Sequence, residues 1–345
     1  MSDAPTAGEV TMTRKDYQTD QEVRWCPGCG DYSILAAVQL LFAELGLKRE
    51  NQVFVSGIGC AARFPYYMDV YGLHSIHGRA PAVATGVALA RPDLDVWVVS
   101  GDGDALSIGG NHLIHSLRRN VNLNILMFNN QIYGLTKGQY SPTSEVGKVT
   151  KSSPFGSLDT PFNPVSIALG AEASFVARTH DLDRKHMMDV MRRAHEHRGA
   201  AFVEVYQNCN VFNDGAFGAV TAKDARAEML ITLEHGEPIR FGNDGQRGVV
   251  LNEFGECVIA EVADVGVERL VVHDEHRVDP ALAFALSRVA TGPTMPTPVG
   301  VFRDVERPTY EVEVQRQLAA ASERQGPGDL AALLASGATW DVAEA

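Results

Sequence analysis

Between Val23 and about Tyr206, short apolar runs alternate with amphipathic stretches of helical length, and this alternation constrains the fold more than any other feature of the sequence. Such an alternation is typical of a parallel sheet with crossover helices. The apolar runs are nearly continuous, so we expect both faces of the sheet to be covered. The chain is therefore predicted to form a doubly wound parallel α/β domain. The predicted strands are Val53–Ser56, Val96–Ser100, Leu123–Phe128, Ala173–Ala177 and Ala201–Val205, and the predicted helices are Tyr32–Leu45, Pro81–Ala90, Leu106–Arg119, Pro164–Leu169 and Leu182–His197.

The sequence changes character along its length. Residues 1–22 are polar and are predicted to form an N-terminal segment outside the α/β domain, which we assign to residues 23–215. Within that domain, residues 140–161 are rich in Ser, Thr, Pro and Gly, and a connection of this length is typical of a mobile active-site loop. In residues 216–345 the helix and strand signals are short, and the stretch GNDGQRGVVLNEFGE has the pattern of a hairpin. We expect this irregular C-terminal extension to pack on the core or on a partner.

Composition and charge exclude several classes of function. The 345 residues carry 30 Lys and Arg against 43 Asp and Glu, a net charge of −13, and the chain has no basic run. Because such a chain repels polyanions, we expect neither nucleic acid nor a membrane surface as a partner. No apolar run approaches the roughly 18 residues of a membrane span, and the N-terminal stretch lacks the apolar core of a signal peptide. We therefore expect a cytoplasmic protein.

The stretch GDGDAL follows a predicted strand and leads into a predicted helix. Glycines at such a junction let the backbone approach a ligand, and the free N–H groups at the start of a helix favour phosphate. A second predicted strand leads into Asn129-Asn130, 25 residues (104–128) after the GDG, so both motifs should reach the same edge of the sheet. The Asp102 carboxylate, the Asn130 amide oxygen and the Ile132 backbone oxygen are hard ligands that suit Mg²⁺ bound to a diphosphate.

This two-part motif resembles the one with which thiamine diphosphate enzymes bind their cofactor through Mg²⁺. The resemblance implies that thiamine diphosphate binds at the carboxyl edge of the predicted sheet. The residues expected to contact the cofactor are Ile58, Gly59, Cys60, His77, Gly101, Gly103, Asp104, Ala105, Asn130 and Leu135.

Four of the five cysteines occur at informative positions. Cys26 and Cys29 flank a Pro-Gly turn in WCPGCGD, a spacing that serves disulfides, zinc sites and iron–sulfur clusters alike. An odd number of cysteines in a chain of this length does not suggest a secreted disulfide framework. Cys60 and Cys209 follow predicted strands and should reach the edge that carries the cofactor. Four thiolates that meet there suit a [4Fe–4S] cluster or a zinc tetrahedron.

The chain from WCPGCGD through GIGC, HGRA, GDGD and NNQIYGLTKGQ to PTPVGVFRDVERPTYE resembles the β subunit of 2-oxoacid:ferredoxin oxidoreductases, most closely the 2-oxoglutarate branch. The resemblance implies that Cys26, Cys29, Cys60 and Cys209 hold one [4Fe–4S] cluster near the thiazolium ring. It implies the conversion of 2-oxoglutarate, CoA and oxidised ferredoxin to succinyl-CoA, carbon dioxide and reduced ferredoxin. The implied partners are a ferredoxin and an α subunit that carries the pyrimidine-binding domain and most of the CoA site, in an (αβ)₂ assembly.

Three further residues are candidates for catalysis or substrate binding. Arg63 follows Cys60 by three positions and Lys137 follows Asn130 by seven, so both are expected near a substrate pocket, where a distal carboxylate needs a cation. His77, which precedes a predicted helix, is a candidate contact for the diphosphate or the substrate carboxylate. The alternative is solvated surface charge for the two cations and a structural role for the histidine.

Other interpretations of the same motifs stay open at this stage. Pyruvate or a branched-chain 2-oxo acid would use the same core chemistry. A non-oxidative thiamine diphosphate decarboxylase with structural zinc would share GDGD and NN without needing four converging cysteines. A zinc-stabilised α/β binding module would keep the cysteines and leave Asp102 and Asn130 incidental. Cys257 lies outside the pattern, and we expect it to be a small buried hydrophobic residue.

Overall fold

The computed structural model describes residues 12–289 and 295–343, so the first eleven residues of the predicted N-terminal segment lie outside it. Its main feature is an eight-stranded sheet in which six neighbouring strands run parallel and the last two, β11 and β7, run antiparallel to them. The predicted doubly wound parallel sheet is confirmed. In spatial order the strands are β2 (Tyr71–His74), β1 (Gln52–Ser56), β3 (Asp95–Gly101), β4 (Leu123–Asn129), β6 (Ala200–Tyr206), β5 (Phe175–His180), β11 (Thr297–Asp304) and β7 (Leu230–Leu233).

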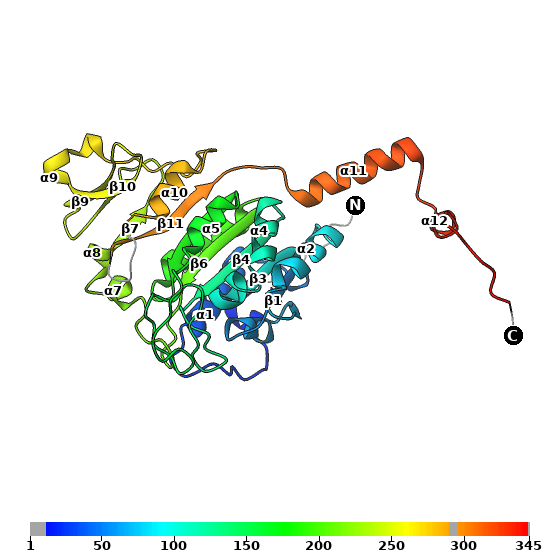
Figure 1. The fold of residues 1–345 in the computed structure, drawn as a ribbon, viewed down its shortest axis with the longest axis horizontal. Helices are drawn as coiled ribbons and strands as arrows, with labels where there is room; N and C mark the ends of the chain where they lie inside the picture. The colour runs from blue at the N-terminus through cyan, green and yellow to red at the C-terminus, as the bar shows by residue number, and fades with distance from the viewer. Residues whose placement is uncertain (1–11, 290–294, 344–345) are drawn as a thin grey trace, which may run out of the picture.

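Helices cover both faces of this sheet (Figure 1). Alternate side chains of a strand point to opposite faces, as in β3, where Val96 and Val98 join one core layer and Trp97 and Val99 join the other. The first layer contains α2 (Ala80–Ala90), α4 (Gly110–Arg118), α5 (Pro164–Gly170) and α10 (Ala281–Ser287), and the second contains α1 (Asp31–Leu45) and α6 (Arg184–Glu196).

Two predicted elements differ from the structure, whereas the others end within two residues of their predicted bounds. The single helix expected over Leu106–Arg119 is α3 (Asp102–Leu106) followed by α4. The helix is interrupted between them around Gly109. A Cβ at this position would lie 2.4 Å from the Asp104 carbonyl oxygen, so the close approach requires glycine. The strand expected over Ala173–Ala177 is β5, which continues to His180. Its polar end is buried between neighbouring elements, so hydrophobicity alone did not reveal it.

The residues after 215 contribute to several parts of the molecule. β7 and β11 complete the main sheet, and the predicted hairpin is present as β9 (Arg247–Leu251) and β10 (Cys257–Glu261), which pair antiparallel in a second sheet with β8 (Arg240–Phe241). Cys257 is buried, as expected. Two helices, α11 (Tyr310–Gln325) and α12 (Leu330–Leu334), extend away from the body of the protein (Figure 1). The remaining short helices are η1 (Arg14–Tyr17), η2 (Arg49–Asn51), η3 (Ala61–Tyr67), α7 (Gly218–Thr221), α8 (Arg226–Met229), α9 (Val262–Val265) and η4 (Val267–Arg269).

The carboxyl ends of β1, β3, β4 and β6 lie at one edge of the sheet because these four strands are parallel. The loops that follow them carry Cys60, the GDG motif, the Asn129-Asn130 pair and Cys209. The fold therefore brings the predicted motifs to a common edge. Within the two described ranges, no helix has the length and apolarity that a membrane span requires.

Candidate cofactor and metal site

A cleft at the carboxyl edge of the sheet contains most of the predicted site residues. Ala105 is an exception, because its side chain packs in the hydrophobic core below the cleft and does not line it. Arg63 and Lys137 also lie outside this cleft. The predicted residues that line it are Ile58, Gly59, Cys60, His77, Gly101, Asp102, Gly103, Asp104, Asn130, Ile132 and Leu135.

Asp102 is buried at the bottom of the cleft, at the start of α3. Its Oδ2 accepts hydrogen bonds from Ser141 Oγ over 2.5 Å and from Thr143 Oγ1 over 2.6 Å. Burial raises the pKa of Asp102 to about 6, although both hydroxyls oppose this shift by stabilising the carboxylate. A cation bound beside Asp102 would complete the stabilisation of its charge.

The second motif presents oxygen ligands to the same cleft. Asn130 Nδ2 donates to Gln207 Oε1 over 2.8 Å, which fixes the orientation of the amide, and Asn130 Oδ1 accepts from the Ile132 N–H over 3.2 Å. The carboxylate of Asp102, the amide oxygen of Asn130 and the backbone of Ile132 therefore meet in one cleft. This set of hard oxygen donors fits Mg²⁺.

The carboxylate of Asp104 accepts hydrogen bonds from three groups of the same chain. Its Oδ1 accepts from the backbone N–H groups of Gly78 (2.8 Å) and Ile58 (3.2 Å), and its Oδ2 accepts from Ser100 Oγ (2.6 Å). His77 Nδ1 lies 2.6 Å from Asp104 Oδ1. Asp104 thus connects the loop that contains Ile58 to the loop that contains His77 and Gly78, and residues of both loops line the cleft.

The four predicted cysteines gather beside this cleft, which Cys60 itself lines. A Cβ on Gly134 would lie 3.5 Å from the Cys60 sulfur and 3.6 Å from the Cys209 sulfur, so a side chain there would enter the space next to both. Gln207 Nε2 lies 3.3 Å from the Cys29 sulfur. Cys26, on the Pro-Gly turn, is exposed, and all five cysteines of the chain are free thiols.

The environment of these thiols favours a positively charged ligand. Burial, reinforced by the nearby Asp31, raises the pKa of Cys60 to about 12 and also raises the pKa of Cys29. Thiolates at these positions therefore need a compensating positive charge, which a metal supplies.

Zinc sites and [4Fe–4S] clusters place their sulfur ligands at different distances from one another. A tetrahedral zinc site has sulfurs about 3.8 Å apart, because its Zn–S bonds are about 2.3 Å long. The four cysteines all belong to the described residues, and no three of their sulfurs lie within 4.8 Å of one another. The sulfurs of a [4Fe–4S] cluster bind four different iron atoms and are more widely spaced.

Three residues of the site, Asp31, Ser141 and Thr143, were not identified from the sequence. Asp31, directly after CPGCG, is 1% exposed and lines the cleft, and burial raises its pKa to about 7. Neither of its carboxylate oxygens has a hydrogen-bond partner among the described residues. Ser141 and Thr143 lie in the loop after NN, and the only local signal for them is the polar SPTS stretch.

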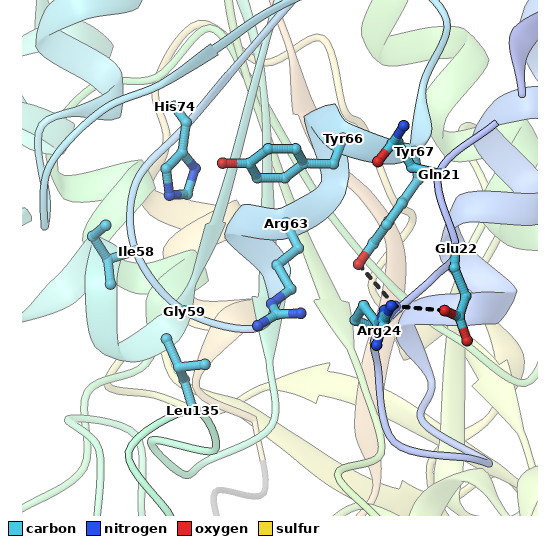
Figure 2. Close-up of a pocket in the computed structure, with 10 residues that line it drawn as sticks. All are labelled: Gln21, Glu22, Arg24, Ile58, Gly59, Arg63, Tyr66, Tyr67, His74 and Leu135. Atoms are coloured by element: carbon cyan, nitrogen blue, oxygen red, sulfur yellow. Dashed lines mark hydrogen bonds and ion pairs between the residues drawn. The ribbon is translucent and has the colours of Figure 1, made fainter. Parts of the chain in front are cut away.

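A second pocket, of about 410 Å³, adjoins the cleft and shares Ile58, Gly59 and Leu135 with it. Figure 2 shows Arg63 at its centre, between the Gly59 and Leu135 side and Arg24. The other lining residues are Gln21, Glu22, Tyr66, Tyr67 and His74.

Lys137 is placed differently from Arg63. It is exposed on a tight turn, where its φ of 73° is left-handed, and its backbone N–H donates to the Gly134 carbonyl over 3.0 Å. Its side chain lines neither the cleft nor the pocket around Arg63. Arg63 therefore lines the pocket that adjoins the cofactor cleft, whereas Lys137, which directly follows the cleft-lining Thr136, lines neither cavity.

Comparisons with known proteins agree with this geometry. Residues 57–205 match the thiamine pyrophosphate enzyme, C-terminal TPP binding domain. The chain is 59% identical over 330 residues to 2-oxoglutarate oxidoreductase subunit KorB of Mycobacterium tuberculosis, covering 95% of this chain and 88% of that protein. It is 46% identical over 198 residues to the β subunit of 2-oxoacid:ferredoxin oxidoreductase 1 of Aeropyrum pernix, covering 57% of this chain and 62% of that protein.

A solved structure is also similar. The 2-oxoglutarate:ferredoxin oxidoreductase from Magnetococcus marinus, with 2-oxoglutarate, coenzyme A and succinyl-CoA bound, contains a chain that is 33% identical. The match has a TM-score of 0.73 and covers 95% of this chain and 97% of that one. The cleft thus lies in a thiamine diphosphate-binding domain, and the chain belongs to the β-subunit family of the 2-oxoacid:ferredoxin oxidoreductases, in its 2-oxoglutarate branch.

Proposed function

We propose that this chain, together with an α subunit, converts 2-oxoglutarate and CoA to succinyl-CoA and carbon dioxide and transfers the electrons to a ferredoxin. The observation that carries this proposal is that Cys60 lines the same cleft as Asp102 and Asn130. A redox centre held by the cysteines would lie directly beside a cofactor held by the two motifs. The relatives named as 2-oxoglutarate oxidoreductases support the reaction.

Thiamine diphosphate, when bound, supplies the electron sink that decarboxylation of a 2-oxo acid requires. Asp102, Asn130 and the Ile132 backbone would hold its Mg²⁺. The backbone at Gly103 is kept in place by Tyr133, whose hydroxyl donates to the Gly103 carbonyl over 2.9 Å. A Cβ on Gly103 would lie 2.3 Å from the Tyr133 ring, so this close approach requires glycine.

One [4Fe–4S] cluster, when bound to the four cysteines, accepts electrons singly and passes them to an external carrier. Burial raises the pKa of the Cys29 and Cys60 thiols, so thiolates there need a compensating positive charge, which supports a metal centre at these cysteines. The position of Cys60 in the cofactor cleft favours a redox centre over a non-oxidative decarboxylase or a binding module with structural zinc.

Arg63 is the residue we assign to the distal carboxylate of the substrate. Its guanidinium lies in the pocket next to the cleft, and Leu135 forms part of the wall between them (Figure 2). A guanidinium binds a carboxylate with two parallel hydrogen bonds, which favours 2-oxoglutarate over pyruvate or a branched-chain 2-oxo acid. His77, whose Nδ1 lies 2.6 Å from Asp104 Oδ1, is assigned to the cofactor side of the cleft. Lys137 lies outside the pocket and is the less favoured candidate.

The cofactor requires a second chain. The aminopyrimidine end of thiamine diphosphate needs a carboxylate from a pyrimidine-binding domain, and one α/β domain binds only the diphosphate end. An α subunit would supply that domain and most of the CoA site, in an (αβ)₂ assembly in the cytoplasm. The names of the relatives, which describe subunits, support a partner chain.

The test uses the chain co-expressed with its α partner under anaerobic conditions. With 2-oxoglutarate, CoA, thiamine diphosphate, Mg²⁺ and oxidised ferredoxin, we expect succinyl-CoA by mass spectrometry and reduced ferredoxin in a 1:2 ratio for a one-electron carrier. Asp102→Asn should abolish both products, because it removes a charged Mg²⁺ ligand. Carbon dioxide release without ferredoxin reduction would instead indicate a non-oxidative decarboxylase and contradict the proposal.

A further inference from the structure

A second group of metal-ligating side chains lies far from the cysteines. His235, Glu275 and His276, the His–Glu cluster, each offer one ligand atom, and these atoms lie within 4.8 Å of one another. The cluster is close to Asp304, the last residue of β11, which pairs with Phe175 at the start of β5. It therefore lies at the amino-terminal edge of the parallel strands, opposite the cofactor cleft.

Backbone hydrogen bonds hold the two segments of the cluster together. The Gly236 N–H donates to the His273 carbonyl over 2.8 Å, and the His273 N–H donates to the Glu237 carbonyl over 3.0 Å. The Asp304 N–H donates to the Glu275 carbonyl over 2.7 Å, which attaches the second segment to β11. The three ligand residues are thus positioned by the fold.

The imidazole of His276 is oriented as in a metal site. Its Nδ1 lies 2.7 Å from the Asp304 carbonyl oxygen, which can only accept, so Nδ1 carries the proton and Nε2 has the free lone pair. Metal-binding histidines usually donate their other N–H in this way. Nε2 lies 3.5 Å from Glu275 Oε1, close to the edge of about 3.4 Å in a tetrahedron with bonds of 2.0–2.2 Å.

Glu275 and His235 complete the arrangement. Glu275 is 5% exposed, and its Oε1 forms an ion pair with Arg193 Nη2 over 2.8 Å, a contact of the kind that orients a ligating carboxylate. The rings of His235 and His276 have centroids 4.6 Å apart, so both can face one ion. Asp274 Oδ1 lies 3.8 Å from His235 Nδ1 and adds negative charge beside the cluster.

We propose that His235, Glu275 and His276 bind one divalent transition-metal ion, such as zinc, with water in the remaining position. Two imidazoles and a carboxylate are ligands that zinc commonly takes. The ion would join the turn at residues 234–237 to the segment before α10, which is hydrogen-bonded to the end of β11. Its role would be to stabilise this edge of the sheet, independently of the cofactor and of the iron–sulfur cluster.

The test uses the untagged full chain in complex with its α partner, with the iron–sulfur cluster intact so that the cysteines are occupied. Zinc affinity is measured by competition with a chromophoric chelator, and Co²⁺ serves as a spectroscopic probe. We expect one zinc per chain, and Co²⁺ bands without a thiolate-to-cobalt charge-transfer band. His276→Ala and Glu275→Gln should each weaken zinc binding by at least about tenfold, as loss of a ligand requires.

A matched variant controls for the loss of a histidine elsewhere. His112→Ala, on α4 and outside the cluster, should bind zinc as the wild type does. Glu275→Gln retains the shape of the side chain, so it separates loss of a ligand from loss of the fold, which circular dichroism checks. Wild-type affinity in both cluster variants, no zinc bound to the wild type, or Co²⁺ bound only through thiolates would each overturn the proposal.

Discussion

Thr143 Oγ1 donates a hydrogen bond to Asp102 Oδ2 over 2.6 Å, although 41 positions separate the two residues in the sequence. The contact connects the loop after the NN motif to the GDG motif. Ser141 makes a parallel contact to the same carboxylate oxygen, and all three side chains are buried. The loop therefore orients Asp102 before any cation binds.

Replacing Thr143 with Val tests this relationship. The change retains the shape of the side chain and removes one donor to the buried carboxylate, and a hydrogen bond to a charged group contributes about 1.5–3 kcal/mol. We expect Mg²⁺-dependent binding of thiamine diphosphate, measured by calorimetry, to weaken about 10- to 100-fold. Thr232→Val, at an exposed position on β7, is the matched control and should bind normally. Unchanged binding in Thr143→Val would show that the loop does not support the metal ligand.

Gly134→Ala tests the space beside the cysteines. The new methyl group would lie 3.5 Å from the Cys60 sulfur and 3.6 Å from the Cys209 sulfur, where the cluster is proposed to bind. We expect lower iron content per chain, with little change in thermal stability. Gly86→Ala in α2 has no atom within 4 Å of its added Cβ and should retain full iron content. Equal iron content in both variants would place the cluster away from Gly134.

Arg63→Met tests substrate selection. Loss of the guanidinium removes the proposed partner of the distal carboxylate, which pyruvate lacks. We expect the ratio of kcat/KM for 2-oxoglutarate over pyruvate to fall by at least about tenfold, equivalent to about 1.4 kcal/mol. The same substitution at Lys137 should leave this ratio nearly unchanged, because Lys137 lies outside the pocket. A larger effect at Lys137 than at Arg63 would reverse the assignment.

The buried His180 is expected to lower the free energy of unfolding in acid. Burial, followed by the charge of Arg226, lowers the pKa of His180 to about 4 from its ordinary value near 6.5. Between these pH values the unfolded chain binds more protons than the folded chain, so the free energy of unfolding decreases as the pH falls from about 6.5 to about 4. The contribution between pH 7 and pH 5 is about 2 kcal/mol.

The measurement is urea denaturation of the full chain at pH 7 and pH 5, followed by tryptophan fluorescence. His180→Asn should lose less stability between the two pH values than the wild type does. Burial also lowers the pKa of His186 and His273, so part of the acid dependence will persist in the variant. An identical loss in both proteins would show that His180 does not contribute.

The positions of the main proposed ligands were predictable because of one physical rule. Parallel strands deliver their carboxyl ends to a common edge, so a motif after each strand must lie near the others. Cys60, Asp102, Asn130 and Cys209 all follow this rule, and the structure places them there.

The remaining features depend on contacts between distant parts of the chain. The hydroxyl of Thr143 is one of many in a polar loop, and only the folded structure shows that it reaches Asp102. Asp31 looks like an ordinary first residue of a helix, yet packing buries it without a hydrogen-bond partner among the described residues. β2 is short and exposed, and β11 pairs with a strand more than a hundred positions earlier. Local hydrophobic patterns contain none of this information.

The most direct test of the account is the electron paramagnetic resonance spectrum of the anaerobic complex with its α partner, before and after addition of 2-oxoglutarate and CoA. We expect the substrate to produce the signal of a reduced [4Fe–4S] cluster, and Cys209→Ser to lack this signal together with part of the iron. A preparation that contains zinc in place of iron, or a cluster that dithionite reduces and 2-oxoglutarate with CoA does not, would contradict the central claim.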